Sequence, residues 1–262
     1  MFVSIVIPTY NRLELLKRAI ASIEAQTYTN YELIIVDDAS DDGTREYLLE
    51  LEHDAIVLSE NQGVSHARNR GAGLAQGECI AFLDSDDCWH EDKLKEQVAF
   101  HKQNAEVKCS FGQEQWFRFK QQVKRPKKYH ANEIVFFNDL LEFTFIGPSS
   151  IMIQRDIFHS LKGFDENLRI CEDFDLWLRL SKLTPMYLAS AVTIYKHAGE
   201  HSQLSASVLL LEPSRVEALM KHKDDKVVQQ VIKKKLEVIK KGAEKHQNRE
   251  MLGFCLLKLK EL

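Results

Sequence analysis

Short apolar runs alternate with helical patterns along the first 105 or so residues. Residues 2–7, 32–36, 55–58 and 79–83 are short, apolar segments, which is typical of buried strands. Between the first two, residues 12–26 carry apolar side chains at helical spacing, and we expect further helices over 44–51 and 63–75. Strand and helix thus alternate about every 25–30 residues, which predicts right-handed βαβ units and a parallel sheet.

The pattern changes after about residue 105. We expect strands over 107–119, 149–153 and 186–195 and helices over 133–143 and 173–183, and from residue 212 onward a lysine-rich helical region. The predicted fold class is therefore α/β: an open Rossmann-like sheet, parallel in its N-terminal half and mixed in its second half, with a helical tail. We divide the chain into one domain over 1–208, with halves 1–105 and 106–208, and a C-terminal extension over 209–262.

Composition excludes several classes of protein. The 262 residues are 44% hydrophobic with a net charge of −4, which is too apolar for a disordered chain. The five cysteines are scattered and never form C-x-x-C, which indicates reduced thiols in a cytosolic compartment. No basic segment precedes the first apolar run, and the apolar runs are far shorter than the roughly 20 residues that span a bilayer. We expect a cytoplasmic protein, or one attached peripherally to the inner face of a membrane.

The net charge conceals an asymmetry. Residues 209–262 carry 13 Lys and Arg against 8 Asp and Glu, whereas residues 1–208 carry 22 against 31. An acidic body argues against a nucleic-acid binder built on one basic face. It is compatible with carboxylates that hold a cation, although surface acidity alone has the same composition.

Polar residues follow three of the predicted strands. They are residues 8–12 (PTYNR), Asp37 and Asp38, and residues 84–87 (DSDD). In an open parallel sheet the carboxyl ends of strands form the ligand site, and five carboxylates there would repel one another unless a divalent cation lay between them. The alternative is that these residues only form turns and cap helices. The sequence lacks G-x-x-x-x-G-K-[ST] and a G-x-G-x-x-G after the first strand, which disfavours P-loop and dinucleotide-binding enzymes.

Six segments together resemble the family 2 glycosyltransferases of the GT-A fold. IVIPTYNR (5–12), IIVDDASDDGT (34–44), NQGVSHARNRG (61–71) and GECIAFLDSDD (77–87) look like its donor half, GFDENLRICEDFDLWLRL (163–180) resembles its acceptor-side segment, and HSQLS (201–205) resembles its metal-binding loop. The resemblance implies an inverting, metal-dependent enzyme that uses Mn²⁺ or Mg²⁺. Its donor would be a nucleoside diphosphate sugar, most simply a UDP-sugar, and its acceptor a hydroxyl of a glycan, lipid-linked or other molecule in cell-surface polysaccharide synthesis.

The resemblance also implies roles for individual residues. Nucleotide-sugar contacts would come from Pro8, Tyr10, Asp38, Arg68, Asp84, Ser85 and Asp86. Within this set, Pro8 and Tyr10 would frame the base, Asp38 would accept its N3–H, and Arg68 would lie near the pyrophosphate. Asp86 would contact the metal and Asp84 the ribose. His201 would complete the metal site, but the local spacing departs from the family pattern, so His197 and His222 stay open as alternatives.

On the acceptor side, Asp173 matches the position of the catalytic base. Glu172 is a tentative acceptor contact that could exchange roles with Asp173, since an acidic residue in a first helical turn can also serve the helix dipole. Trp177 and Trp89 could stack on an acceptor sugar, and helical spacing makes a core position for Trp177 equally open. Tyr10 could instead pack on the first helix, and either Arg68 or Arg70 could form a surface ion pair.

Two other functions remain open at this stage. A sugar nucleotidyltransferase would be expected to have a glycine-rich first loop, whereas this loop reads PTYNR. A non-catalytic nucleotide-sugar or glycan-binding module would be expected to have lost either D-x-D or the acidic pair at 172–173. The basic extension over 209–262 could contact an anionic membrane, or its apolar stripe could pack on the body or on another subunit.

Overall fold

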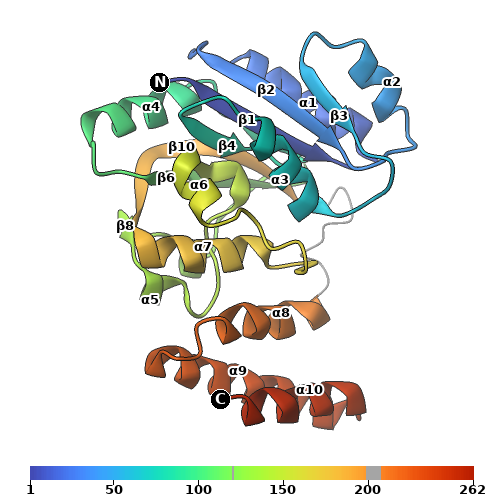
Figure 1. Cartoon of the computed structure of the whole chain (residues 1–262), viewed down its shortest axis with the longest axis vertical. Coiled ribbons are helices and arrows are strands. Elements are labelled where there is room, and N and C mark those ends of the chain that lie inside the picture. The colour runs from blue at the N-terminus through green and yellow to red at the C-terminus, as the bar shows by residue number, and fades with distance from the viewer. Residues whose placement is uncertain (120, 199–207) are drawn as a thin grey trace.

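The N-terminal half has the predicted alternation of strands and helices, as Figure 1 shows for the computed structural model. Its strands are β1 (Val3–Thr9), β2 (Tyr31–Asp37), β3 (Asp54–Val57) and β4 (Cys79–Phe82), and its helices are α1 (Leu13–Glu24), α2 (Thr44–Leu49) and α3 (Val64–Leu74). The four strands pair in parallel in the order β3-β2-β1-β4. The structure describes residues 1–119, 121–198 and 208–262.

The second half extends the same sheet with mixed pairing. Its strands along the main path are β6 (Cys109–Arg118), β9 (Ile151–Gln154) and β10 (Met186–Ala198), and the N-terminal half adds β5 (Asp87–Trp89) at the edge. β9 is antiparallel to both β4 and β6, β10 is parallel to β6, and β5 is antiparallel to β10. The sheet order continues as β4-β9-β6-β10-β5, with β7 (Gln121–Val123) and β8 (Ile134–Val135) at its margins. The prediction of a parallel half followed by a mixed half is confirmed.

The structure departs from the predicted elements in the second half. Residues 133–143 form β8 and the single turn α5 (Phe137–Leu140) rather than one helix, and α6 (Arg155–Ser160) was not predicted. Helix α4 (Lys93–Gln103) was also missed, because its buried face includes Lys93, Gln97 and His101 and so lacks an apolar stripe. Helix α8 (Val208–Met220) begins before residue 212, with Pro213 in its interior.

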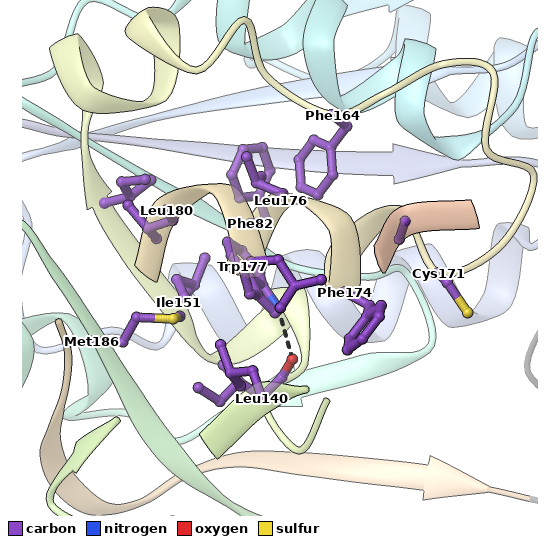
Figure 2. Packing of buried hydrophobic residues seen from close by; sticks show 14 of the residues in the cluster. Phe82, Leu140, Ile151, Phe164, Cys171, Phe174, Leu176, Trp177, Leu180 and Met186 are labelled. Atoms are coloured by element: carbon purple, nitrogen blue, oxygen red, sulfur yellow. Dashed lines mark hydrogen bonds between the residues drawn. The ribbon is translucent and has the colours of Figure 1, made fainter. Parts of the chain in front are cut away.

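Two buried clusters hold the helices on the sheet. Ile5 and Ile7 of β1 belong to a cluster with residues of α1 and α4, whereas Val6 belongs to a larger one with residues of α3 and of α7 (Glu172–Leu183). This division follows from the strand period of two, which directs successive side chains to opposite faces. Figure 2 shows how side chains of α7 fill the larger cluster, with Trp177 among them.

The C-terminal helices α8, α9 (Lys226–Lys245) and α10 (Arg249–Lys260) lie beyond α7 in Figure 1. Buried apolar residues of α8 and α9 join the same cluster as α7. Lys235, within the lysine-rich run, is buried and donates to the Glu142 carbonyl at 2.6 Å and to Glu212 at 3.0 Å. Across the described ranges, no helix is long and apolar enough to cross a membrane.

Candidate active site

A cavity of about 480 Å³ lies where the carboxyl ends of β1 and β4 meet the second half of the sheet. The N-terminal half lines it with Pro8, Arg12, Val64, Arg68 and residues 84–87. The second half contributes Glu114, Trp116, Arg125, Tyr129, residues 144–148, residues 170–174 and Lys196, and helix α8 contributes Leu211 and Arg215. Seven predicted site residues therefore share one cavity: Pro8, Arg68, Asp84, Ser85, Asp86, Glu172 and Asp173. The strand-end argument predicted Pro8 and residues 84–86, whereas Arg68, Glu172 and Asp173 were predicted from the family resemblance.

Arg68 on α3 links the two halves of this cavity. Its Nη2 donates to Asp84 Oδ1 at 2.6 Å and its Nη1 to Glu172 Oε1 at 2.8 Å. Burial opposes ionisation of Asp84, but Arg68 and Lys196 outweigh it and lower the pKa of this carboxyl. The bridge therefore holds an ionised Asp84 and the first turn of α7 in one arrangement.

The placement of Arg68 differs from the sequence interpretation. We expected its guanidinium near the pyrophosphate, yet both terminal nitrogens already bind carboxylates and only 3% of the residue is exposed. Its neighbour Arg70 is exposed. The ion pair considered for one of these arginines thus belongs to Arg68, and it is buried rather than on the surface.

Ser149 fixes the segment that follows β4. The backbone N–H of Asp84 donates to its Oγ at 3.1 Å, and its hydroxyl donates to Asp87 Oδ2 at 2.6 Å. Burial, followed by repulsion from the other carboxylates of the segment, raises the pKa of Asp87 well above its ordinary value. Trp89 Nε1 donates to the Ser149 carbonyl at 2.9 Å, so one residue holds both ends of the segment.

Asp86 carries the carboxylate that best fits a metal at this site. It faces the cavity, and its Oδ2 lies 3.1 Å from Arg12 Nη1. Among the residues that the structure describes, no three Asp, Glu, His or Cys side chains are grouped so as to hold a metal unaided. A single carboxylate that faces the cavity, as Asp86 does, fits a hard cation shared with substrate phosphates, since Mg²⁺ is commonly held by one or two carboxylates together with them.

Asp173 lines the cavity from the first turn of α7. Burial, and then the charge of Glu172, raises the pKa of Asp173 to about 7. Cys171 before this pair has a left-handed backbone with φ of 63°, a conformation that costs free energy for a residue other than glycine and recurs at functional sites. A carboxyl with a pKa near neutrality, in a cavity, is suited to general base chemistry.

Tyr10 and Asp38 do not belong to the described lining of this cavity. Tyr10 is 45% exposed, so its ring is not packed into the core. Asp38 is buried, and its two carboxylate oxygens accept the backbone N–H groups of Gln62 and Gly63, each at 2.8 Å. These bonds attach the end of β2 to the start of α3, so the structure gives Asp38 a structural contact in addition to its predicted contact with a base.

The proposed metal ligand His201 lies outside the described residues. Of its two alternatives, His222 packs edge-on against Phe137 at 5.5 Å, and burial lowers its pKa to about 4. His197, on β10, stacks on Phe117 at 5.3 Å.

Of the two interpretations of Trp177, the structure supports the core position, and Trp89 is buried as well. Trp177 is fully buried and donates from Nε1 to the Ile146 carbonyl at 3.0 Å, which Figure 2 shows within the core. Trp89 is 3% exposed, and its indole N–H is bound to Ser149. Both indoles therefore have their faces and their donors occupied by the fold.

Sequence reasoning missed the second half of the lining. Lys196 lies among acidic side chains: Glu114 Oε1 is 3.8 Å from its Nζ, and although burial disfavours its charge, Glu114 and Asp87 raise the pKa of Lys196. Trp116 and Arg125 accompany Glu114 on this side of the cavity. The pairing of β6 with β10 brings Glu114 and Lys196 together, and no residue spacing in the sequence predicts this pairing.

A family model described as glycosyl transferase family 2 matches residues 4–162. The chain is 35% identical over 186 residues to the putative teichuronic acid biosynthesis glycosyltransferase TuaG of Bacillus subtilis, covering 69% of this chain and 72% of the relative. It is 34% identical to UDP-Glc:alpha-D-GlcNAc-diphosphoundecaprenol beta-1,3-glucosyltransferase WfgD of Escherichia coli, over 69% of this chain and 70% of the relative.

Solved structures share the architecture at low identity. The crystal structure of S. aureus TarS 1-349 in complex with UDP-GlcNAc has a TM-score of 0.75 at 18% identity, covering 99% of this chain and 80% of that one. The mannosyltransferase PcManGT from Pyrobaculum calidifontis, in complex with GDP-Man and Mn²⁺, has a TM-score of 0.62 at 17% identity, with coverage of 99% and 84%.

Proposed function

The chain belongs to glycosyltransferase family 2 and has the GT-A fold, and from this premise we propose that it transfers a sugar from a UDP-sugar to an acceptor hydroxyl in cell-surface polysaccharide synthesis. The observation that carries the proposal is the single cavity that joins the Asp84–Asp86 carboxylates to Asp173. TarS complexes with UDP and UDP-GlcNAc, and the name of WfgD, support a uridine donor and a lipid-linked sugar acceptor.

Asp173 would act as the general base. As the acceptor oxygen attacks the anomeric carbon, its proton passes to the Asp173 carboxylate, and the bond from that carbon to the phosphate oxygen breaks with its electron pair going to the nucleoside diphosphate. One displacement inverts the configuration. A pKa of about 7 leaves a substantial share of Asp173 ionised at neutral pH. The bridge from Arg68 through Glu172 would keep α7, and so this carboxylate, aimed at the donor.

A divalent cation, Mn²⁺ or Mg²⁺, held by Asp86 and the donor phosphates, would supply positive charge that stabilises the leaving diphosphate. The Mn²⁺ in the PcManGT complex supports this part of the proposal. Pro8, Tyr10, Asp38 and Ser85 would contact the nucleotide, with His201 completing the metal site.

The division of the chain is also part of the proposal. Residues 1–105 would bind the donor and residues 106–208 the acceptor, and the extension over 209–262 would make peripheral membrane contact or an oligomer interface. Exposed leucines of α10, namely Leu256, Leu257 and Leu259, lie among its basic residues and support a contact role. The site would then work at the inner face of a membrane, where lipid-linked acceptors are presented.

A thermal-shift panel of nucleotide sugars, with and without Mn²⁺ or Mg²⁺, tests the proposed donor. A ligand present at 100 times its dissociation constant stabilises the folded state by about 2.7 kcal/mol, a shift that is easily measured. We expect a UDP-sugar to raise the melting temperature and to be consumed by transfer or slow hydrolysis. Binding without any turnover would favour the non-catalytic alternative, and no stabilisation by any nucleotide sugar would contradict the proposal.

A further inference from the structure

The second half of the cavity has an aromatic wall that the proposed chemistry does not use. The ring centroids of Trp116, on β6, and Tyr129 are 5.3 Å apart, and both residues line the cavity. Tyr129 meets Phe143 edge-on at 5.5 Å, and Phe143 meets Phe145 at 6.3 Å. Four rings from three stretches of chain thus form one continuous set of contacts, and all but Phe143 line the cavity.

Polar groups fix the edge of the Trp116 indole. Its Nε1 donates to Glu114 Oε2 at 2.9 Å, and the Arg125 guanidinium lies 5.8 Å from the ring. Arg125 is itself held, because it donates to the Phe145 carbonyl at 2.6 Å and lies 3.5 Å from Glu114 Oε2. The indole is therefore pre-organised, with Glu114 at its edge and the Arg125 guanidinium over its ring.

The exposure of Trp116 separates it from the structural tryptophans. Trp177 and Trp89 are almost completely buried, whereas Trp116 is only half-buried at the cavity. An indole that is rigidly held yet open on the cavity side is an arrangement that ligand sites use and cores do not.

The chemistry of the wall selects a class of ligand. A pyranose ring has a face of C–H groups, which packs on an aromatic ring, and a rim of hydroxyls, which hydrogen-bond to charged side chains. Trp116 and Tyr129 offer the first kind of surface, and Glu114 and Arg125 hold it in place. A uracil base would also stack on these rings, but the carboxyl end of β1, where the nucleotide is expected, belongs to the other half of the sheet.

We propose that Trp116 and Tyr129 form the stacking wall of an acceptor subsite, which takes the pyranose ring whose hydroxyl Asp173 deprotonates. This inference rests on the proposed glycosyl transfer and adds the class of acceptor and the residues that recognise it. Glu114 and Arg125 position this wall, because their charged groups are largely buried and bound to the indole, to each other and to the Phe145 carbonyl.

Saturation-transfer NMR with methyl pyranosides of the gluco, galacto and N-acetylglucosamine series tests the subsite without knowledge of the natural acceptor. The proteins are wild type, Trp116→Ala, Trp116→Phe and, as an aromatic control outside the cavity lining, the exposed Phe136→Ala. Thermal unfolding checks that each variant folds, and a UDP titration of each measures the nucleotide site separately.

We expect at least one pyranoside to receive saturation in wild type, in Phe136→Ala and, more weakly, in Trp116→Phe. Its affinity should fall about tenfold in Trp116→Ala, while UDP affinity stays unchanged. Equal pyranoside binding by Trp116→Ala and wild type would overturn the subsite, and so would loss of UDP binding in a folded Trp116→Ala, which would assign the wall to the base. Failure of wild type to bind UDP at all would instead remove the proposed function, and the subsite with it.

Discussion

The hydroxyl of Ser149 donates to the buried carboxylate of Asp87 at 2.6 Å while it accepts the backbone N–H of Asp84 at 3.1 Å. One side chain from the turn at residues 148–150, just before β9, thus holds the D-x-D segment. The segment also has a turn of its own, in which the Asp87 N–H donates to the Asp84 carbonyl at 2.9 Å, and the Ser149 hydroxyl contacts both ends of that turn.

Ser149→Ala should lower both the stability of the protein and its affinity for the donor. Removing the hydroxyl leaves a buried carboxyl without its partner, which typically costs about 1–3 kcal/mol. We expect a lower melting temperature and a UDP affinity reduced severalfold. Ser150→Ala is the matched control, because its buried hydroxyl donates to the Gly147 carbonyl at 2.7 Å and does not contact the segment. Equal effects of the two variants on UDP affinity would argue against the positioning role.

Arg68→Met should be among the most damaging single changes in the chain. It would leave Asp84 and Glu172 buried without their shared cation, and breaking such a bridge costs about 3–5 kcal/mol. Arg70→Met, on the exposed side of the same helix, should change stability by no more than about 0.5 kcal/mol. Chemical denaturation of both variants measures the difference, and similar midpoints would show that the bridge does not hold the two halves together.

Gly147→Ala should lower activity with little loss of stability. A Cβ at this position would lie 2.7 Å from Glu114 Oε1 and 2.8 Å from Lys196 Nζ, so both charged groups must move within the cavity. Displacements of this size in an active site can reduce turnover about 10²-fold. Gly73→Ala on α3 has open space around it and serves as the control in a side-by-side rate assay. Unchanged turnover in Gly147→Ala would mean that neither charge needs its present position.

Asp173→Asn should abolish transfer and retain the fold, because the amide cannot accept the acceptor proton. Loss of a general base typically reduces the rate about 10²–10⁴-fold. Rates of UDP release in the presence of acceptor, for wild type and for this variant, measure the effect. Near-normal turnover would mean that another group, first of all Glu172, acts as the general base.

The pH dependence follows from the raised pKa of Asp173. Activity at low substrate should rise with pH and level off above about 7, since the carboxylate is the active form. The stability of the protein should change in the opposite direction. Folding raises the pKa of Asp173 from 3.8 to about 7, so the folded protein binds this proton more tightly than the unfolded chain. The contribution of Asp173 to the free energy of unfolding therefore falls as the pH rises from about 4 to about 7. Wild type should lose stability relative to Asp173→Asn over that range, and a constant difference would contradict the assignment.

The sequence was most informative where one side-chain period dominates. Buried strands such as β1 and β2, and the amphipathic α1, were predictable because their apolar spacing has no competing interpretation. The meeting of Asp84, Asp86 and Asp173 in one cavity followed from strand-end geometry together with the family resemblance. Helix α4 was not predictable, because Lys93 and Gln97 take positions where apolar residues would mark a buried face.

The sequence did not predict the roles of side chains whose partners are distant along the chain. In the sequence Trp177 fits an acceptor pocket and a core position equally well, and only the packing of α7 shows that it is in the core. The partners of Arg68 are likewise 16 and 104 residues away, at separations that no local pattern reports.

The central claim is that one cavity binds the donor diphosphate at Asp86 and holds the base at Asp173. Calorimetric titration of UDP with Mn²⁺ into wild type, Asp86→Asn and Asp173→Asn tests it most directly. We predict that wild type and Asp173→Asn bind UDP with similar affinity and that Asp86→Asn loses at least tenfold. Undiminished binding by Asp86→Asn, or equal losses in both variants, would contradict this arrangement of the site.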